Sequence, residues 1–310
     1  MIEQQEIKYG YIACVGRPNV GKSTLINKLV GAKVSAVSPK PQTTRRSIIG
    51  IRTIKEKDKI YQIVFFDTPG IHKPRDELGV QMVKNAIDSL RSANIVYHLI
   101  DASEGIRGED LDVYENLKEI IESEKLNPVL FCVLTKIDLI KKDELLPIID
   151  EVGKWNFYQE IIPVSALKNE NISDLISTTI RYLPQEEEIH FPENTFFGLP
   201  LKIMVQEIIM EKIYNYTHME IPYCTAIDIE EITPRNSNVL YIKATIYVEK
   251  SGQKKIIIGE DGSKIKQIGT MAREEIELLT GKKVYLDLWV KVRKDWRKNI
   301  HFVKKIYFSD

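Results

Sequence analysis

Residues 16–23 read Gly16-Arg17-Pro18-Asn19-Val20-Gly21-Lys22-Ser23, which is a complete G-x-x-x-x-G-K-[ST] phosphate-binding loop. The loop follows an apolar run at 11–15 and leads into a helical pattern at 24–30, the strand–loop–helix setting that the motif requires. Gly16 and Gly21 let the backbone curl so that N–H groups and the positive end of the helix face phosphate oxygens. Lys22 is predicted to reach the β- and γ-phosphates and Ser23 to ligate Mg²⁺. The remaining nucleotide contacts of the loop are expected from Asn19, Val20 and Thr24.

Two downstream segments carry further groups for the metal and the γ-phosphate. Asp67-Thr68-Pro69-Gly70 ends an apolar run at 60–66, so Asp67 is predicted at a strand end, where it would hold Mg²⁺ through water. Gly70 lacks a Cβ and can bring its N–H close to the γ-phosphate. The polar segment 41–46 contains two threonines, and we favour Thr44 over Thr43 as the residue that completes the Mg²⁺ shell. A basic surface loop without this role is the alternative for that segment.

Two more motifs indicate guanine as the base. Thr135-Lys136-Ile137-Asp138 follows an apolar run at 129–134, and the Asp138 carboxylate matches the N1–H and N2–H₂ donors of guanine, a pair that adenine lacks. Thr135 stands where asparagine is commoner, which weakens one base contact. Ser165-Ala166-Leu167 follows a fourth apolar run and is expected to close the base pocket. The predicted ligands are therefore GTP or GDP with Mg²⁺, and Lys136 belongs to the same base site.

The composition is that of a globular protein with unevenly distributed charge. The 310 residues have a formal net charge of +0, but residues 250–308 hold 15 Lys and Arg against 7 Asp and Glu. This excess suggests a polyanionic partner, with a lysine-rich solvated surface as the alternative. Cys14 and Cys132 fall in apolar strands and are interpreted as small core residues. The sequence has no signal-peptide pattern and no apolar stretch of 18 residues, so a cytoplasmic location is expected.

Strand-like and helical runs alternate up to about Pro184, which predicts an α/β fold. The sheet should be doubly wound and mostly parallel, with one antiparallel edge strand because 47–54 and 60–66 resemble a hairpin. All four nucleotide motifs follow strands, so they should gather at the carboxyl edge of that sheet. We therefore predict a GTPase domain at 1–184, a linker rich in proline and glutamate at 185–198, and a second domain at 199–310.

The second domain shows a different order of elements. A helical stripe from Leu201 is followed by two alternating strands, a Gly-x-x-Gly segment, a helix and a last strand. This order resembles an α+β KH RNA-binding domain of type II, whose glycine loop clamps a short stretch of single-stranded backbone. Glu260 and Asp261 repel phosphate and temper the expected affinity. Trp296 is predicted to stack on a base, with a place in the domain core as the alternative. The expected RNA-binding residues are Ile258, Gly259, Glu260, Asp261, Gly262, Ser263, Lys264 and Trp296.

In these motifs and their order, nearly the whole chain resembles the Era family of GTPases. The resemblance implies a GTP-dependent switch that binds the 3′ end of 16S rRNA and assists maturation of the 30S subunit. It also implies a cytoplasmic protein with some peripheral contact with the inner membrane, and we expect a monomer. The alternatives are a signalling GTPase, or a GTPase linked to RNA modification, whose second domain binds another partner.

The expected hydrolysis is slow. Ile71 follows the Asp-Thr-Pro-Gly segment and cannot orient water, so Lys22, Thr44 and Gly70 are the predicted catalytic groups. We hypothesise stimulation by a partner or by K⁺, because GTPases of this kind that respond to K⁺ carry an asparagine at the position of Asn19.

Overall fold

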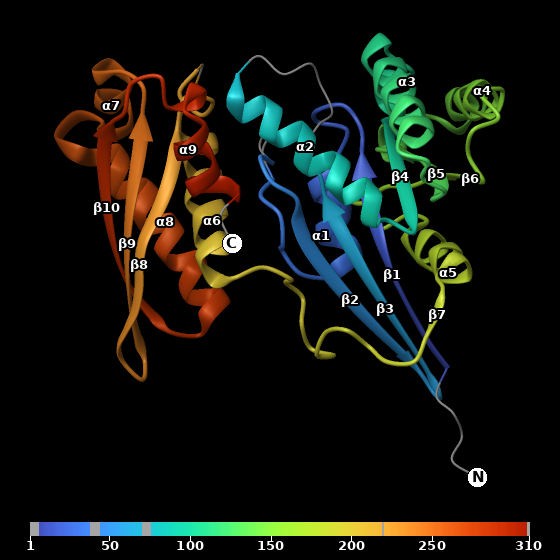
Figure 1. Ribbon diagram of the computed structural model, residues 1–310, viewed down its shortest axis with the longest axis horizontal. Coiled ribbons are helices and arrows are strands. Elements are labelled where there is room, and N and C mark those ends of the chain that lie inside the picture. Colours follow the sequence, from blue (N-terminus) through green and yellow to red (C-terminus); the bar gives the residue numbers. More distant parts are fainter. Residues whose placement is uncertain (1–5, 38–43, 70–75, 219, 309–310) are drawn as a thin grey trace. The chain divides into compact units, whose positions relative to one another are not determined.

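The computed structural model describes residues 6–37, 44–69, 76–218 and 220–308. The chain divides into two compact units, one built mainly from residues 1–198 and the other mainly from residues 199–310 (Figure 1). Thr43, Gly70 and Ile71, to which the sequence analysis assigned or denied roles, lie outside the described residues.

The first unit is an α/β fold around one twisted sheet. Its strands are β1 (Glu6–Val15), β2 (Ile48–Glu56), β3 (Lys59–Asp67), β4 (Ile95–Asp101), β5 (Val129–Thr135), β6 (Glu160–Pro163) and the short β7 (Gln185–Glu186). The order in the sheet is β2-β3-β1-β4-β5-β6, with β7 beside β1. The central pairs are parallel, whereas β2 and β3 form an antiparallel hairpin. The predicted mostly parallel sheet with one antiparallel edge strand is therefore confirmed.

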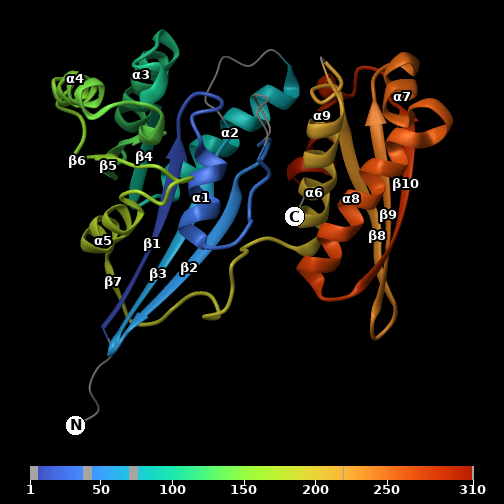
Figure 2. The same ribbon diagram turned by 180° about the vertical axis from the view of Figure 1, so that it is seen from behind.

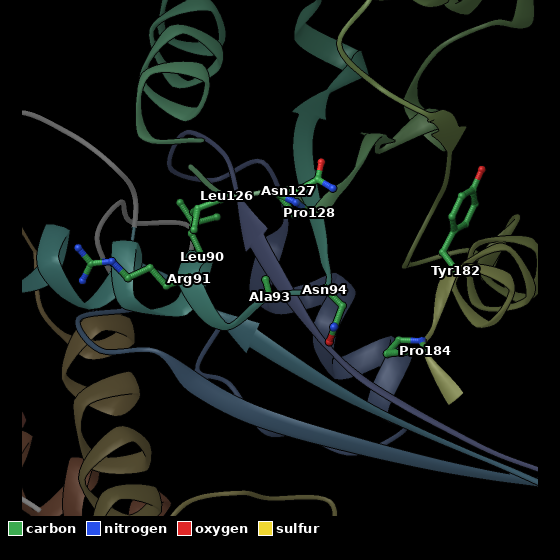
Figure 3. A pocket seen from close by; sticks show the side chains of 9 residues that line it. All are labelled: Leu90, Arg91, Ala93, Asn94, Leu126, Asn127, Pro128, Tyr182 and Pro184. Atoms are coloured by element: carbon green, nitrogen blue, oxygen red, sulfur yellow. The ribbon is translucent and has the colours of Figure 1, made fainter. Parts of the chain in front are cut away.

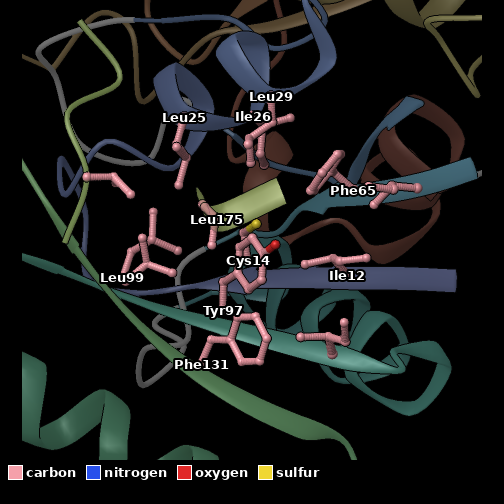
Figure 4. Packing of buried hydrophobic residues seen from close by; sticks show 14 of the residues in the cluster. Ile12, Cys14, Leu25, Ile26, Leu29, Phe65, Tyr97, Leu99, Phe131 and Leu175 are labelled. Carbon is pink, nitrogen blue, oxygen red and sulfur yellow. The ribbon is translucent and has the colours of Figure 1, made fainter. Parts of the chain in front are cut away.

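Helices cover both faces of this sheet because both faces of its strands are apolar. The helices are α1 (Lys22–Val30), α2 (Glu77–Ser92), α3 (Gly108–Ser123), α4 (Lys142–Gly153) and α5 (Ile172–Tyr182). Leu29 of α1 and Leu175 of α5 pack on Ile12 and Tyr97 in one core cluster (Figure 4). On the opposite face, Val113 of α3 packs with residues of α2, β1 and β4. Burial on both sides explains the continuous apolar run of β4, every residue of which is buried.

The segment 185–198, expected to be a linker, is bound to the first sheet. Gln185–Glu186 pairs antiparallel with β1, and the Ile51 N–H donates to the Phe196 carbonyl at 2.9 Å. The Gln62 side chain, buried in β3, also donates to the Phe191 carbonyl. These bonds attach residues 185–198 to the edge strand β2 and to β1 and β3, which a composition rich in proline and glutamate does not reveal.

The second unit contains the predicted helix, two strands, helix and strand, and one additional helix, between the second strand and the glycine loop, that the sequence pattern did not predict. The elements are α6 (Leu201–Tyr216), β8 (Ala226–Asn236), β9 (Val239–Val248), α7 (Ser251–Ile258), α8 (Ser263–Thr280), β10 (Lys283–Val292) and the short α9 (Ile300–Val303). The sheet order is β10-β9-β8, with β8 and β9 antiparallel and β9 and β10 parallel. Helices α6 and α8 lie together against one face of this sheet (Figure 2).

One boundary in the second unit differs from the sequence-based expectation. The alternating apolar pattern from Tyr223 to Ile232 predicts a strand that starts at Tyr223. The observed strand β8 begins at Ala226, because Glu220 to Cys224 form turns in which the N–H groups of Tyr223 and Cys224 donate to the Glu220 carbonyl. Among the described helices of the whole chain, none combines the length and the apolar character needed to cross a membrane.

Candidate functional site

The phosphate loop connects β1 to α1 and curls around the ammonium group of Lys22. Lys22 Nζ donates to the carbonyl oxygens of Gly16 at 2.8 Å and Arg17 at 2.9 Å. A Cβ on Gly16 would lie 2.6 Å from the Leu99 carbonyl, so only glycine fits where the loop passes β4. Burial lowers the pKa of Lys22 to about 8, an effect that the nearby Asp67 carboxylate partly opposes. The loop is thus preformed, with a buried cation at its centre.

Three oxygen groups meet beside this loop. Ser23 Oγ donates to Asp67 Oδ2 at 2.6 Å, and Thr44 Oγ1 donates to the same oxygen at 3.2 Å. The Asp67 side chain is fully buried, and its Oδ1 has no hydrogen-bond partner among the described residues. Burial raises the pKa of Asp67, which the hydrogen bond from Ser23 and the charge of Lys22 oppose.

A buried carboxylate oxygen without a partner needs a compensating group. Hydroxyl and carboxylate oxygens are ligands that Mg²⁺ accepts, so Ser23, Thr44 and Asp67 fit the predicted metal. The structure brings these three predicted residues together, and it places Thr44, the favoured threonine, in the cluster. When bound, Mg²⁺ would neutralise phosphate charge.

The two predicted base motifs lie on neighbouring strand ends. Thr135 ends β5 and Ser165 follows β6, and the Ile137 N–H donates to the Val164 carbonyl at 3.4 Å, which joins the two loops. Asp138 lies half-buried in a short 3-10 turn, and its carboxylate accepts no hydrogen bond from the residues that the structure describes. Ala166 packs partly against the core, whereas Leu167 is 77% exposed. Leu167, predicted to help close the base pocket, thus extends to solvent.

Three carboxylates that the sequence motifs did not reveal fix these loops. Asp101, at the end of β4, holds Lys136 Nζ at 2.6 Å. Asp110, at the start of α3, accepts from Arg17 Nε at 3.1 and 3.2 Å, and Glu104 accepts from Arg17 Nη2 at 2.6 Å. The position of Asp101 at a strand end was an available signal. Nothing in the sequence links Arg17 to Asp110, which lies 93 residues away.

A cavity of about 310 Å³ in the first unit lies away from these groups (Figure 3). Its walls include Asn94 and Pro128, just before β4 and β5 begin, so it opens at the edge of the sheet opposite to the phosphate loop. Arg91, its cationic group, is paired with Asp88 and Glu124. The cavity contains none of the predicted nucleotide ligands, and its one guanidinium is already neutralised by carboxylates.

In the second unit the glycine loop joins α7 to α8. The Gly259 N–H closes α7 by donating to the Lys255 carbonyl at 2.9 Å, and Gly262 is the N-cap residue before α8. Gly259 has a φ of 76°, and a Cβ there would lie 2.8 Å from Lys264 Cβ and 2.9 Å from its backbone nitrogen. Only glycine therefore permits this close turn. Glu260 and Asp261 are exposed, and Ile258 and Lys264 are half-buried at the two ends of the loop.

The prediction that Trp296 stacks on RNA needs correction. Its side chain is 0% exposed, and Nε1 donates to the Cys224 carbonyl at 2.8 Å. Phe302 and Tyr307 pack around it, with ring centroids at 6.0 and 6.3 Å. An indole whose surface and donor are both occupied within the domain offers no face to a base, so the alternative place in the core is the observed one.

Comparison with known proteins agrees with both units. A family model described as a 50S ribosome-binding GTPase matches residues 11–136, and a KH domain model matches residues 220–297. GTPase Era of Aquifex aeolicus is 44% identical over 304 residues, which cover 96% of this chain and 98% of that protein. The chain belongs to the Era family of GTPases.

Solved Era structures share this architecture. A crystal structure of an Aquifex aeolicus Era variant bound to GDP·AlF₄⁻ superposes with a TM-score of 0.89 at 44% identity, covering 96% of this chain and 98% of that one. An Era in complex with MgGDPNP and nucleotides 1506–1542 of 16S ribosomal RNA also gives 0.89 at 44% identity, covering 97% and 98%. Membership of the Era family confirms the predicted α/β GTPase fold followed by a KH domain, and the prediction of an enzyme that hydrolyses GTP.

Proposed function

We propose that this chain is a GTP-hydrolysing switch whose KH unit binds the 3′ end of 16S rRNA and which assists maturation of the 30S ribosomal subunit. The observation that carries the proposal is the cluster of Ser23, Thr44 and Asp67 beside the buried ammonium of Lys22. A related Era bound to MgGDPNP and 16S nucleotides supports both ligands. The same complex weighs against a signalling or RNA-modifying role.

Different residues of the site would bind different parts of GTP. The curled loop from Gly16 to Thr24 would hold the phosphates through backbone N–H groups and Lys22. Asp138 would accept from guanine, with the segments around Lys136 and Ser165 forming the pocket. Loss of the γ-phosphate would release the segments around Thr44 and Gly70, which is how GTPases of this class change state. Most of the catalysis would come from positioning and electrostatics, because phosphoryl transfer needs no covalent intermediate on the protein.

The proposal is tested by RNA binding in defined nucleotide states. The probe is a synthetic RNA corresponding to nucleotides 1506–1542 of 16S rRNA, titrated with the full chain in MgGDPNP, MgGDP or MgAMPPNP. Tighter binding in MgGDPNP alone is expected. Equal affinity in all three states, or a preference for the adenine analogue, contradicts the proposal.

Two charged variants test the RNA loop, and Gly262→Asn is the neutral control for the backbone strain that a side chain meets at the φ of 74° of Gly262. Gly262→Asp adds a negative charge at the start of α8, where phosphate is expected. Gly252→Asp adds the same charge in α7 at a glycine with open space around it. Only Gly262→Asp should weaken RNA binding, by about tenfold or more, while GDP affinity stays the same for both. Equal RNA affinities of the two variants would place the RNA elsewhere.

Three further parts of the prediction are proposed on the same basis. Asn19, whose φ of 65° turns the loop, is proposed to favour K⁺ near the phosphates; equal hydrolysis rates in K⁺ and Na⁺ buffers would contradict this. The proposed domains are a GTPase domain at 1–184, a linker at 185–198 and a KH domain at 199–310. Differential scanning calorimetry should show two thermal unfolding transitions, and GDP should raise the midpoint of only one of them. The proposed state is a cytoplasmic monomer with peripheral membrane contact, which light scattering and cell fractionation check.

A further inference from the structure

Thr135 uses its hydroxyl group inside the protein. The side chain ends β5 and is 4% exposed. Its Oγ1 lies 2.6 Å from the Val20 carbonyl of the phosphate loop and 3.2 Å from the Ile100 carbonyl of β4. Both neighbours are carbonyl oxygens, which only accept hydrogen bonds. The single hydroxyl proton of Thr135 therefore lies between two acceptors and is directed away from the base site.

An asparagine, the commoner residue here, has a different inventory of hydrogen-bonding groups. Its amide carries two N–H donors, so one can bind an inner carbonyl while the other remains for a ligand. Thr135 supplies only the inner bond, the one that ties the base loop to the phosphate loop across 115 residues of sequence. Its remaining lone pairs can only accept, and the purine atoms on this side, N7 and O6 of guanine, are themselves acceptors.

The neighbouring groups of the base loops are also occupied. Lys136 Nζ is held by the buried carboxylate of Asp101 at 2.6 Å. Ser165 Oγ accepts the Lys168 N–H at 3.0 Å, which shapes its own turn. The Asp138 carboxylate, by contrast, accepts no bond from the described residues. Base recognition by this motif thus falls on the side of guanine that carries N1 and N2.

We propose that residue 135 makes no hydrogen bond to N7 of the base, so that the protein accepts guanine nucleotides altered at N7 and selects guanine through Asp138. This inference rests on the guanine-nucleotide binding proposed above. The inference defines the substrate class more closely as purine nucleotides that carry the N1–H and N2–H₂ donors, with either nitrogen or carbon at ring position 7 of the purine. Thr135 is then a positioning residue that joins two loops.

The test compares four diphosphates on the unmodified full chain by competition with a fluorescent GDP. The probes are GDP, 7-deaza-GDP, IDP (which lacks the N2 amino group) and ADP. We expect 7-deaza-GDP to bind within about twofold of GDP, and IDP about tenfold or more weaker, because it leaves the charged Asp138 one donor short. ADP should bind weakest, since it offers neither donor. A loss of fivefold or more with 7-deaza-GDP overturns the inference.

Two variants sharpen the comparison. Thr135→Asn adds a second donor and should create a preference for GDP over 7-deaza-GDP of about fivefold to tenfold. Thr135→Ser retains a single hydroxyl and should show no such preference. An equal response of both variants to 7-deaza-GDP contradicts the role given to the second donor. If Thr135→Asn does not fold, the result for the unmodified chain still decides.

The outcome also separates this inference from the proposed function. ADP binding as tightly as GDP would refute the guanine-nucleotide function itself. A clear preference for GDP over ADP, combined with weak binding of 7-deaza-GDP, would leave that function intact and refute only the assignment at residue 135.

Discussion

Replacing Trp296 by phenylalanine should destabilise the KH unit while leaving its affinity for RNA unchanged. The indole is fully buried and donates to the Cys224 carbonyl at 2.8 Å. Trp289, seven positions earlier, offers a matched control because its side chain is 54% exposed and its Nε1 donates to Asp287 at the surface. The two substitutions are chemically identical and differ in burial.

The magnitude follows from what phenylalanine cannot replace. Loss of a buried hydrogen bond costs about 1 kcal/mol. The smaller ring leaves unfilled volume between Phe302 and Tyr307, which adds about 1–2 kcal/mol. Trp296→Phe should therefore lower the free energy of unfolding of the KH unit by about 2–3 kcal/mol. Trp289→Phe removes little buried surface and should change it by less than about 0.5 kcal/mol.

Hydrogen exchange measures this on the intact chain. Amides of β9, the central strand of the KH sheet, exchange through opening of that unit, so their rates report its stability. Trp296→Phe should accelerate them about 30- to 150-fold, which corresponds to 2–3 kcal/mol. The 16S RNA probe, titrated under folding conditions, should bind both variants alike.

The refuting result is the reverse pattern. If Trp296→Phe weakens RNA binding while β9 exchange stays at the rate of the unmodified chain, the indole contacts RNA after all. Equal exchange rates for the two tryptophan variants would contradict the assigned burial.

Three further predictions test the rest of the site. The pKa of Lys22 is lowered from 10.5 to about 8 in the nucleotide-free protein, so between these pH values the unfolded chain binds more protons than the folded one, and the free energy of unfolding should rise with pH. Thermal unfolding should show a smaller rise of stability with pH for Lys22→Met than for the unmodified chain, and an equal rise would contradict the lowered pKa of Lys22. Asp110→Ala leaves the buried Arg17 guanidinium without its main partner and should lower the free energy of unfolding by about 3 kcal/mol, whereas Glu104→Ala removes a half-exposed partner and should lower it by less than about 1 kcal/mol. Chemical denaturation measures both values, and equal losses would show that burial of the ion pair does not matter. Gly259→Ala places a Cβ within 2.9 Å of Lys264, whereas the nearest atom to the Cβ of Gly262→Ala is 4.0 Å away. Gly259→Ala should therefore reduce RNA affinity about tenfold more than Gly262→Ala in filter binding, and similar affinities of the two variants would exclude a role for the tight turn.

Much of the fold was predictable because its signals are local. The helical pattern at 24–30 corresponds to α1, which begins at Lys22 and lies between Gly21 and Gly31, because glycine caps and apolar periodicity act within a few residues. The mostly parallel sheet followed from alternating elements, and the assembly of the motifs at one edge followed from the parallel direction of the strands. The segment 185–198 was harder to interpret, because its attachment depends on pairing with a sheet edge that composition does not reveal.

The sequence by itself determined which groups carry the chemistry: the phosphate loop, the carboxylates Asp67 and Asp138, and the Gly-x-x-Gly turn, each marked by a short pattern beside an apolar strand. Only the tertiary structure decided which partners hold them. The Arg17–Asp110 and Thr135–Val20 contacts join residues 93 and 115 positions apart, and the burial of Trp296 depends on Cys224, 72 positions away. Such contacts arise from packing between distant segments, and a residue's type does not reveal whether its polar atom faces a ligand or another part of the chain.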